Sequence, residues 1–148
     1  MQYVILLLVA FVAGVFLPLQ TGLNTKIGNT VGNPVYAALI SFVIGTIGLV
    51  VYLLVTRADF GAVQRAASLP FYYWLGGLIG AFYVAAVIIL APKLGTALTF
   101  GLTVAGQMLF SLYVDHLGLM GVAQHLITWQ RVVGILLILG GVLLIQRF

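Results

Sequence analysis

Amide side chains interrupt an almost unbroken apolar segment near the start of the chain. Residues 17–25 read LPLQTGLNT and follow the run YVILLLVAFVAGVF. Gln20 and Asn24 are four residues apart and therefore share one face of a helix. An amide in hydrocarbon without a hydrogen-bond partner is unfavourable, so both must face protein or water. The segment is either a helix end that meets water or the lining of a polar cavity inside a membrane.

A second set of polar residues follows one face of a later helix. This helix is predicted at about 95–117. At about 100° per residue, five of its polar side chains fall within an arc of roughly 120°: Thr96, Thr99, Thr103, Gln107 and Ser111. Gln107 lies near the middle of this helix, where it must face protein or water. Threonine and serine also bond to their own helix, so the stripe is either a cavity lining or a helix–helix contact. The predicted cavity-lining residues are Gln20, Asn24, Thr99, Thr103, Gln107 and Ser111.

Two opposite charges stand near helix ends that disfavour them. Asp115 lies in the last turn of one predicted helix and Arg131 in the first turn of the next. Each sits at the wrong end of its helix dipole, and a mutual ion pair would offset both mismatches. The sequence predicts this pair, with proton coupling through Asp115 or His116 as the alternative. His116 otherwise contacts headgroups or the carbonyl groups at the helix end.

The composition indicates which elements position these residues. Hydrophobic residues make up 64% of the 148 residues and charged residues 5%, which excludes a water-soluble fold. Six scattered basic residues make no nucleic-acid patch. Charge-free runs long enough to span a bilayer, about 17–25 residues, predict an all-α integral membrane protein. We expect a single domain over 1–148 with transmembrane helices at about 3–25, 34–56, 70–91, 95–117 and 128–147.

Proline, asparagine and glycine mark the predicted helix boundaries. Asn33 before Pro34 is typical of a helix N-cap followed by proline at the first helical position. Pro70 is expected to open the third helix and Pro92 to end it, while Gly118 ends the fourth. Pro18 is expected to bend the first helix just before its polar end.

Glycine residues at helical spacing predict close helix contacts. In lipid, small residues let helix backbones approach where apolar burial no longer drives association. Packing within the chain is the simpler interpretation, and a dimer contact is the alternative for at least one of these faces. The predicted packing residues are Gly76, Gly77, Gly80, Gly134 and Gly141.

The basic residues are balanced between the two membrane sides. Five spans place Arg57, Arg65 and Arg131 on one side, and Lys26, Lys93 and Arg147 on the other. An excess of Lys and Arg on one side normally orients a membrane protein, and this chain has none. We therefore expect insertion in both orientations and an antiparallel, dual-topology dimer of ten helices, which is an inverted-repeat architecture. The alternative is orientation by some other signal.

Several segments resemble one family along essentially the whole chain. They are QTGLNTKIG, NPVYAALISFVIGT, LGGLIGAFYVAAVIILAPKLGTA, VAGQMLFSLYVDHLGLMG and WQRVVGILLILGGVLL. Together they resemble the YdcZ-like family of small five-helix proteins of the bacterial inner membrane, in the drug/metabolite transporter superfamily. The resemblance implies half of a ten-helix transporter, occurring as dual-topology chains, as paired opposite chains or as fused duplicates.

The expected function is a small-molecule transporter in the bacterial inner membrane. We expect an exporter of a small polar or amphipathic metabolite or drug, working by alternating access as an antiparallel homodimer or with a paired homologous chain. The alternatives are a passive channel and a non-transporting membrane subunit. With no cysteine, no glutamate, no histidine pair at metal spacing and no serine near a base, we expect no enzyme, metal site or cofactor.

Overall fold

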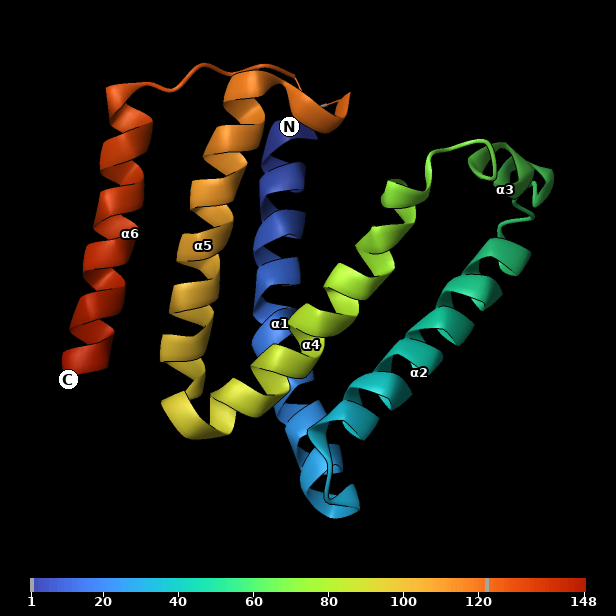
Figure 1. Ribbon diagram of the computed structural model, residues 1–148, viewed down its shortest axis with the longest axis horizontal. Coiled ribbons are helices and arrows are strands. Elements are labelled where there is room, and N and C mark those ends of the chain that lie inside the picture. Colours follow the sequence, from blue (N-terminus) through green and yellow to red (C-terminus); the bar gives the residue numbers. More distant parts are fainter. Residues whose placement is uncertain (1, 122) are drawn as a thin grey trace. The chain divides into compact units, whose positions relative to one another are not determined.

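The chain is built from helices in the computed structural model, which describes residues 2–121 and 123–148 (Figure 1). Within these residues five helical segments are long and apolar enough to cross a membrane, and none is a strand. The predicted all-helical fold with five spans is therefore confirmed. In chain order the elements are α1 (Gln2–Val31), α2 (Pro34–Val55), α3 (Gly61–Ala66), the 3-10 helix η1 (Phe71–Trp74), α4 (Leu75–Leu94), α5 (Thr96–Leu117), the 3-10 helix η2 (Leu119–Gly121) and α6 (Trp129–Arg147).

Two predicted helix boundaries have the expected geometry. The Asn33 side chain accepts a hydrogen bond of 2.8 Å from the Val35 amide, and Pro34 takes the first position of α2. Gly118 ends α5 in the left-handed conformation, with a φ of 61° that a residue with a Cβ rarely adopts. Both ends are thus determined by local backbone chemistry.

The first helix runs further than the sequence predicts. It continues through Pro18 and ends at Val31 instead of residue 25. In lipid the remaining backbone groups have no water to bond, so the helix persists around the one missing N–H. Its end is a local glycine cap: Gly32 leaves the helical conformation with a φ of 74°, and the Asn33 amide donates to the Gly28 carbonyl at 3.0 Å. A Cβ on Gly28 would lie 3.2 Å from Pro34 Cα, so the start of α2 lies close to this end.

Pro92 does not end α4 as predicted. The helix includes Pro92 and continues to Leu94, because a proline in the last turn removes only one ladder bond. The Gly95 amide donates to the Ala91 carbonyl at 3.0 Å, and Gly95 then leaves the helical conformation with a φ of 85°. The glycine therefore closes this helix.

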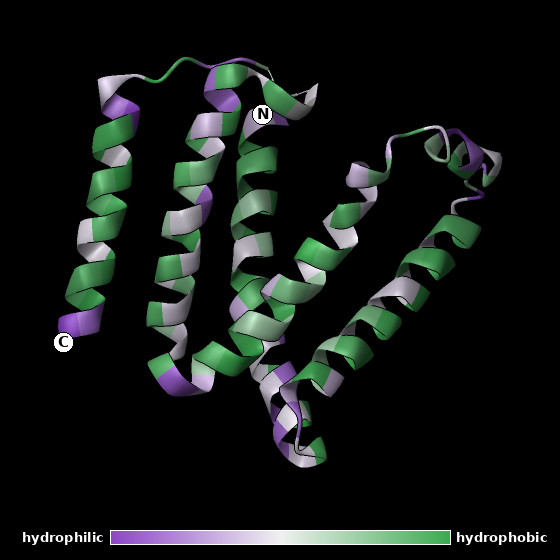
Figure 2. Cartoon of the chain, in the orientation of Figure 1, coloured by the Kyte–Doolittle hydropathy of each residue, from purple (hydrophilic) through white to green (hydrophobic). Residues whose placement is uncertain are grey.

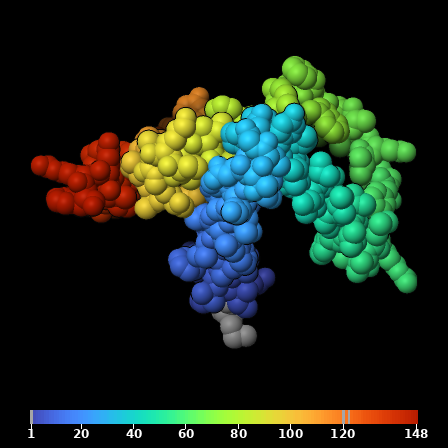
Figure 3. Space-filling view, turned by 90° about the horizontal axis from the view of Figure 1, so that it is seen from below, coloured from blue at the N-terminus to red at the C-terminus, as the bar shows by residue number. Residues whose placement is uncertain are grey.

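The described chain divides into two compact units, and each is described by itself. The first, Met1–Ile89, contains α1, α2, α3, η1 and most of α4. Its core is a small cluster of Ala37, Ala38 and Ile88, with Ile27 and Val84 among the residues packed against it. The two alanines let α2 approach its neighbours near the α1–α2 turn. Further along, the N-terminal half of α1 stands clear of α2 (Figures 1 and 3).

The second unit, Leu90–Phe148, is built on the hairpin of α5 and α6. Thr99 and Ala105 are buried on α5, and Ile135 and Val142 on α6. A Cβ on Gly101 would lie only 2.9 Å from Val142 Cγ2, so the two helices approach each other closely at this point. The hairpin depends on a glycine in the contact.

Apolar side chains cover the outside of the helices rather than a large interior. Figure 2 shows hydrophobic residues along the helices and hydrophilic residues gathered mostly at helix ends and in loops. Large side chains such as Tyr3, Phe11 and Phe82 are more than 70% exposed. Contiguous apolar surface of this extent is unstable in water and fits a lipid environment.

Candidate functional site

The amide pair of α1 meets a hydroxyl of α2. Gln20 Nε2 donates to Ser41 Oγ at 3.3 Å. Ser41 is seven residues into α2, which places it about 10 Å from the start of that helix and well inside the span. Asn24, one turn further along α1, is only 4% exposed. The structure thus brings both predicted amides of α1 to the same helix contact.

These polar groups lie in a groove whose other walls are apolar. The groove has a volume of about 360 Å³, and its nine lining residues include Phe16, Ile40 and Ile44 with Gln20, Asn24 and Ser41. A second groove of about 230 Å³ includes Gln20 and Ser41 as well, together with Thr46. The Gln20–Ser41 hydrogen bond therefore borders both grooves. A few polar groups in an apolar wall are typical of a site that orients a small molecule.

Ser41 is a site residue that the sequence pattern did not identify. Its signal was a lone hydroxyl inside the apolar run ALISFVIG, which is equally typical of a small residue in a helix contact. Only the pairing of α1 with α2 shows that this hydroxyl faces Gln20. The periodicity of residues along each helix does not show which residue of α2 lies opposite a given residue of α1.

Three buried polar atoms of the first unit have no hydrogen-bond partner among the described residues. They are Asn24 Nδ2, Thr25 Oγ1 and Tyr83 Oη. An unsatisfied buried polar group costs about 1–3 kcal/mol, so it is usually retained for a reason. Of these three residues, Asn24 is the one that lines the groove at Gln20 and Ser41.

The polar stripe of α5 belongs to the second unit and has a different environment. Thr99 is 1% exposed, and its hydroxyl donates to the Gly95 carbonyl of its own helix end at 2.8 Å. The Thr103 hydroxyl donates to the Phe100 carbonyl at 3.1 Å. Both hydroxyls are therefore satisfied locally. Gln107 is exposed on the surface of the chain, and Ser111 lines a groove between α5 and α6.

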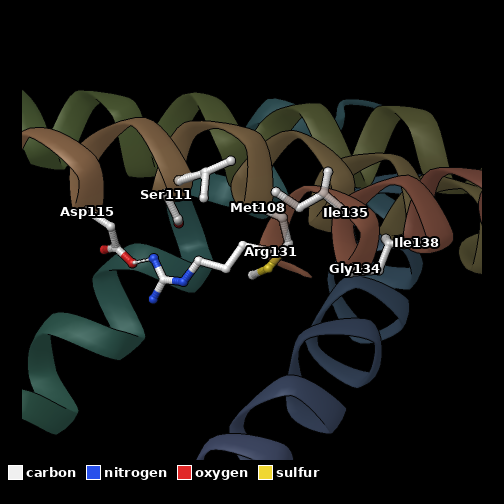
Figure 4. Close-up of a pocket in the computed structure, with 8 residues that line it drawn as sticks. Met108, Ser111, Asp115, Arg131, Gly134, Ile135 and Ile138 are labelled. Atoms are coloured by element: carbon white, nitrogen blue, oxygen red, sulfur yellow. Dashed lines mark hydrogen bonds and ion pairs between the residues drawn. The ribbon is translucent and has the colours of Figure 1, made fainter. Parts of the chain in front are cut away.

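Asp115 and Arg131 meet at one end of that groove. Arg131 Nη1 lies 3.2 Å from Asp115 Oδ2, with side-chain exposures of 37% and 29% respectively (Figure 4). The same nitrogen donates to the His125 carbonyl at 3.4 Å. The pair joins the C-terminal turn of α5 to the N-terminal turn of α6, where each charge alone opposes its helix dipole. The groove has a volume of about 380 Å³ and is lined by Met108, Ser111, Leu112, Asp115, Arg131, Gly134, Ile135 and Ile138.

His116 fastens the loop between these two helices. Its Nδ1 accepts a hydrogen bond of 3.3 Å from the Ile127 amide, and its carbonyl accepts one of 2.9 Å from Gln124 Nε2. Both contacts join the end of α5 to the loop that leads into α6. In the described residues, no three potential ligands among His, Cys, Asp and Glu are grouped for a metal ion.

The predicted packing glycines differ in their surroundings. A Cβ on Gly80 would lie 3.7 Å from Phe42 Cζ, which is an ordinary contact. At Gly76, Gly77, Gly134 and Gly141 a Cβ would meet nothing within 4 Å among the described residues. Close approaches between two of the membrane-spanning helices occur at Gly28 and Gly101 instead.

Five apolar spans with few charges define a multi-pass membrane protein. The model of the family described as "Putative inner membrane exporter, YdcZ" matches residues 5–144, and the chain belongs to this family. The resemblance in the sequence and the inner-membrane location are thereby confirmed, and the family points to a transporter rather than an enzyme. No curated protein and no solved structure matches the chain.

Proposed function

We propose that the protein exports a small polar or amphipathic metabolite or drug, and that the groove at Gln20, Asn24 and Ser41 binds it. The observation that carries this proposal is the groove itself, in which Gln20, Asn24 and Ser41 place amide and hydroxyl groups in an otherwise apolar wall. A transported molecule with polar and apolar parts would match this lining.

The lining of the groove supports an uncharged or weakly polar substrate. The residues around both grooves of the first unit carry amide, hydroxyl and apolar side chains, and none of these described residues is charged. A buried charge on the substrate would have no counter-charge there and would be strongly disfavoured. Phe16 and the isoleucine side chains would contact the apolar part of the molecule. The volume of about 360 Å³ falls in the usual range for small-molecule sites, about 300–1,000 Å³.

The working unit in this proposal is an antiparallel homodimer of ten helices. Its support is the equal number of basic residues, three and three, on the two membrane sides. In such a dimer the inward-open and outward-open states are the same structure seen from opposite sides, so alternating access requires no second fold. Gly76, Gly77 and Gly141 have open space around them and are available for contacts with the partner copy.

Transport by the groove is tested by removing its amides. A transported compound can be identified by thermal stabilisation, since a bound molecule raises stability by mass action. We expect Gln20→Ala and Asn24→Ala to abolish transport of that compound. Asn29→Ala is the matched control, because Asn29 is an exposed amide of the same helix outside the groove. The measurement is uptake into proteoliposomes, with dimer content measured in parallel. Normal transport by either groove variant would show that its side chain is only part of a helix contact.

Two further measurements separate the alternatives. Exchange of labelled against unlabelled compound faster than net flux is expected of a carrier, whereas equal rates would indicate a passive channel. C-terminal reporters active only inside or only outside the cell should both give signal. Signal from one reporter alone would refute the dual topology, and purification without any dimer would favour a non-transporting subunit.

A further inference from the structure

The groove of the second unit is charged at one end and apolar at the other. On α5 its four lining residues run from Met108 to Asp115 at positions i, i+3, i+4 and i+7, which is one helix face. On α6 four residues from Arg131 to Ile138 repeat the same spacing. Figure 4 shows the ion pair at one end of this arrangement and Met108, Ile135 and Ile138 further along. The two faces together form an amphipathic trough about 10 Å long.

The orientation of the trough matches that of a membrane lipid. Asp115 is two residues from the end of α5, and Arg131 is two residues from the start of α6. The charged end therefore lies toward the membrane interface, while the apolar end extends toward the middle of the span. A headgroup at the interface and an acyl chain along the trough would match it in both polarity and direction.

The ion pair leaves most of its hydrogen-bonding capacity unused. The contact of 3.2 Å is made by a single nitrogen and a single oxygen, whereas an arginine–carboxylate pair often forms two shorter bonds. In the described part of the chain, both hydrogen bonds of the Arg131 side chain come from Nη1, which leaves Nε and Nη2 free. The side chains are 37% and 29% exposed, so both heads are accessible.

Charge complementarity favours one kind of headgroup. The site presents one cation and one anion side by side, so it suits a headgroup that carries both a phosphate and an ammonium group. The phosphate would accept bonds from Arg131 and the ammonium would donate to Asp115. An anionic headgroup would place a second negative charge beside Arg131, which already pairs with the Asp115 carboxylate, and would leave the site with a net negative charge. A quaternary ammonium has no N–H to donate to that carboxylate.

We propose that the α5–α6 trough binds a phospholipid of the phosphatidylethanolamine type, with its headgroup on Arg131 and Asp115 and the start of an acyl chain along Met108, Ile135 and Ile138. This site is separate from the groove of the first unit, and the inference does not rest on the proposed transport. The lipid would cover an apolar trough and satisfy the free donors of Arg131.

Thermal unfolding of the purified full-length protein in detergent tests the headgroup. Phosphatidylethanolamine at roughly 100-fold above its Kd should raise Tm by about 5–10 °C. Phosphatidylcholine and phosphatidylglycerol at equal concentration should give clearly smaller shifts, and soluble glycerophosphoethanolamine should give none. Equal shifts from phosphatidylglycerol would overturn the charge argument. An equal shift from the soluble headgroup would show a site for small zwitterions instead of lipid.

A pair of glycine variants locates the effect in the trough. Gly134→Leu places a side chain in the trough, and Gly140→Leu places the same side chain about 240° around α6. At both positions the added Cβ has nothing within 4 Å among the described residues, and both glycines are exposed on α6. We expect Gly134→Leu to lose the phosphatidylethanolamine shift and Gly140→Leu to keep it. Retention of the shift in Gly134→Leu would exclude the trough as the site.

Native mass spectrometry of the unmodified protein provides a readout that needs no variant. After gentle extraction from bacterial membranes, phosphatidylethanolamine should remain bound in preference to phosphatidylglycerol. Selective retention of phosphatidylglycerol, or no retained lipid after extraction, would contradict the proposal even if Gly134→Leu proved unstable.

Discussion

Gly101 is the position at which one added methyl group should have the largest effect on the α5–α6 hairpin. In Gly101→Ala the new Cβ would lie 2.9 Å from Val142 Cγ2 and 3.5 Å from Val142 Cγ1. Carbon atoms normally approach to about 3.5–4.0 Å, so one of the two helices must move by roughly 0.6 Å or more. Val142 is 4% exposed and β-branched, which leaves it little freedom to rotate away.

The expected change combines two opposing terms. Overpacking of a well-packed contact costs about 1–3 kcal/mol. Alanine in place of glycine inside a helix contributes about 0.5–1 kcal/mol in the other direction. We therefore expect Gly101→Ala to lower the free energy of unfolding by up to about 2.5 kcal/mol. Gly106→Ala, on the same helix with nothing within 4 Å of its Cβ, should be unchanged or more stable by about 0.5–1 kcal/mol.

The measurement is unfolding of both variants in mixed micelles with increasing denaturing detergent. Val142→Ala removes the two methyl groups that meet the new Cβ, so the double variant should lose less stability than the sum of the single changes. If Gly101→Ala proves as stable as Gly106→Ala, the close approach of α5 and α6 at this point is wrong.

Three further changes test other parts of the fold. Asn33→Ala removes the side chain that accepts from the Val35 amide and should lower stability by about 1 kcal/mol in the same unfolding assay, while Asn33→Asp should be nearly neutral. Gly118→Ala places a Cβ on a residue with a φ of 61° and should cost about 1–2 kcal/mol; an unchanged Tm would mean that α5 ends differently. The variant with the two charges exchanged, Asp115→Arg with Arg131→Asp, should be at least as stable as the natural protein. Each charge then lies at the end of its helix that the dipole favours, and this interaction contributes about 0.3–1 kcal/mol per charge. Asp115→Asn and Arg131→Gln alone should each lose expression or stability, and failure of the exchange to restore it would indicate a specific role for the natural arrangement.

The sequence by itself determined the class of the protein and the local chemistry of its helix ends. Charge-free apolar runs specify membrane-spanning helices because lipid offers no partner to backbone groups, and this requirement does not depend on tertiary contacts. The caps at Asn33 and Gly118 were predictable for a similar reason, since each depends on one residue and its immediate neighbours. The proximity of Asp115 to Arg131 was also predictable from the sequence, because a single loop joins the helix ends on which they lie.

Only the tertiary structure decided which residues of neighbouring helices face one another. Ser41 faces Gln20 because of the angle and register at which α2 meets α1, which helical periodicity does not encode. The close contact at Gly101 is likewise decided by how closely Val142 of α6 packs against the backbone of α5. In each case the deciding quantity is a distance between two helices, and a pattern along one helix carries no information about it.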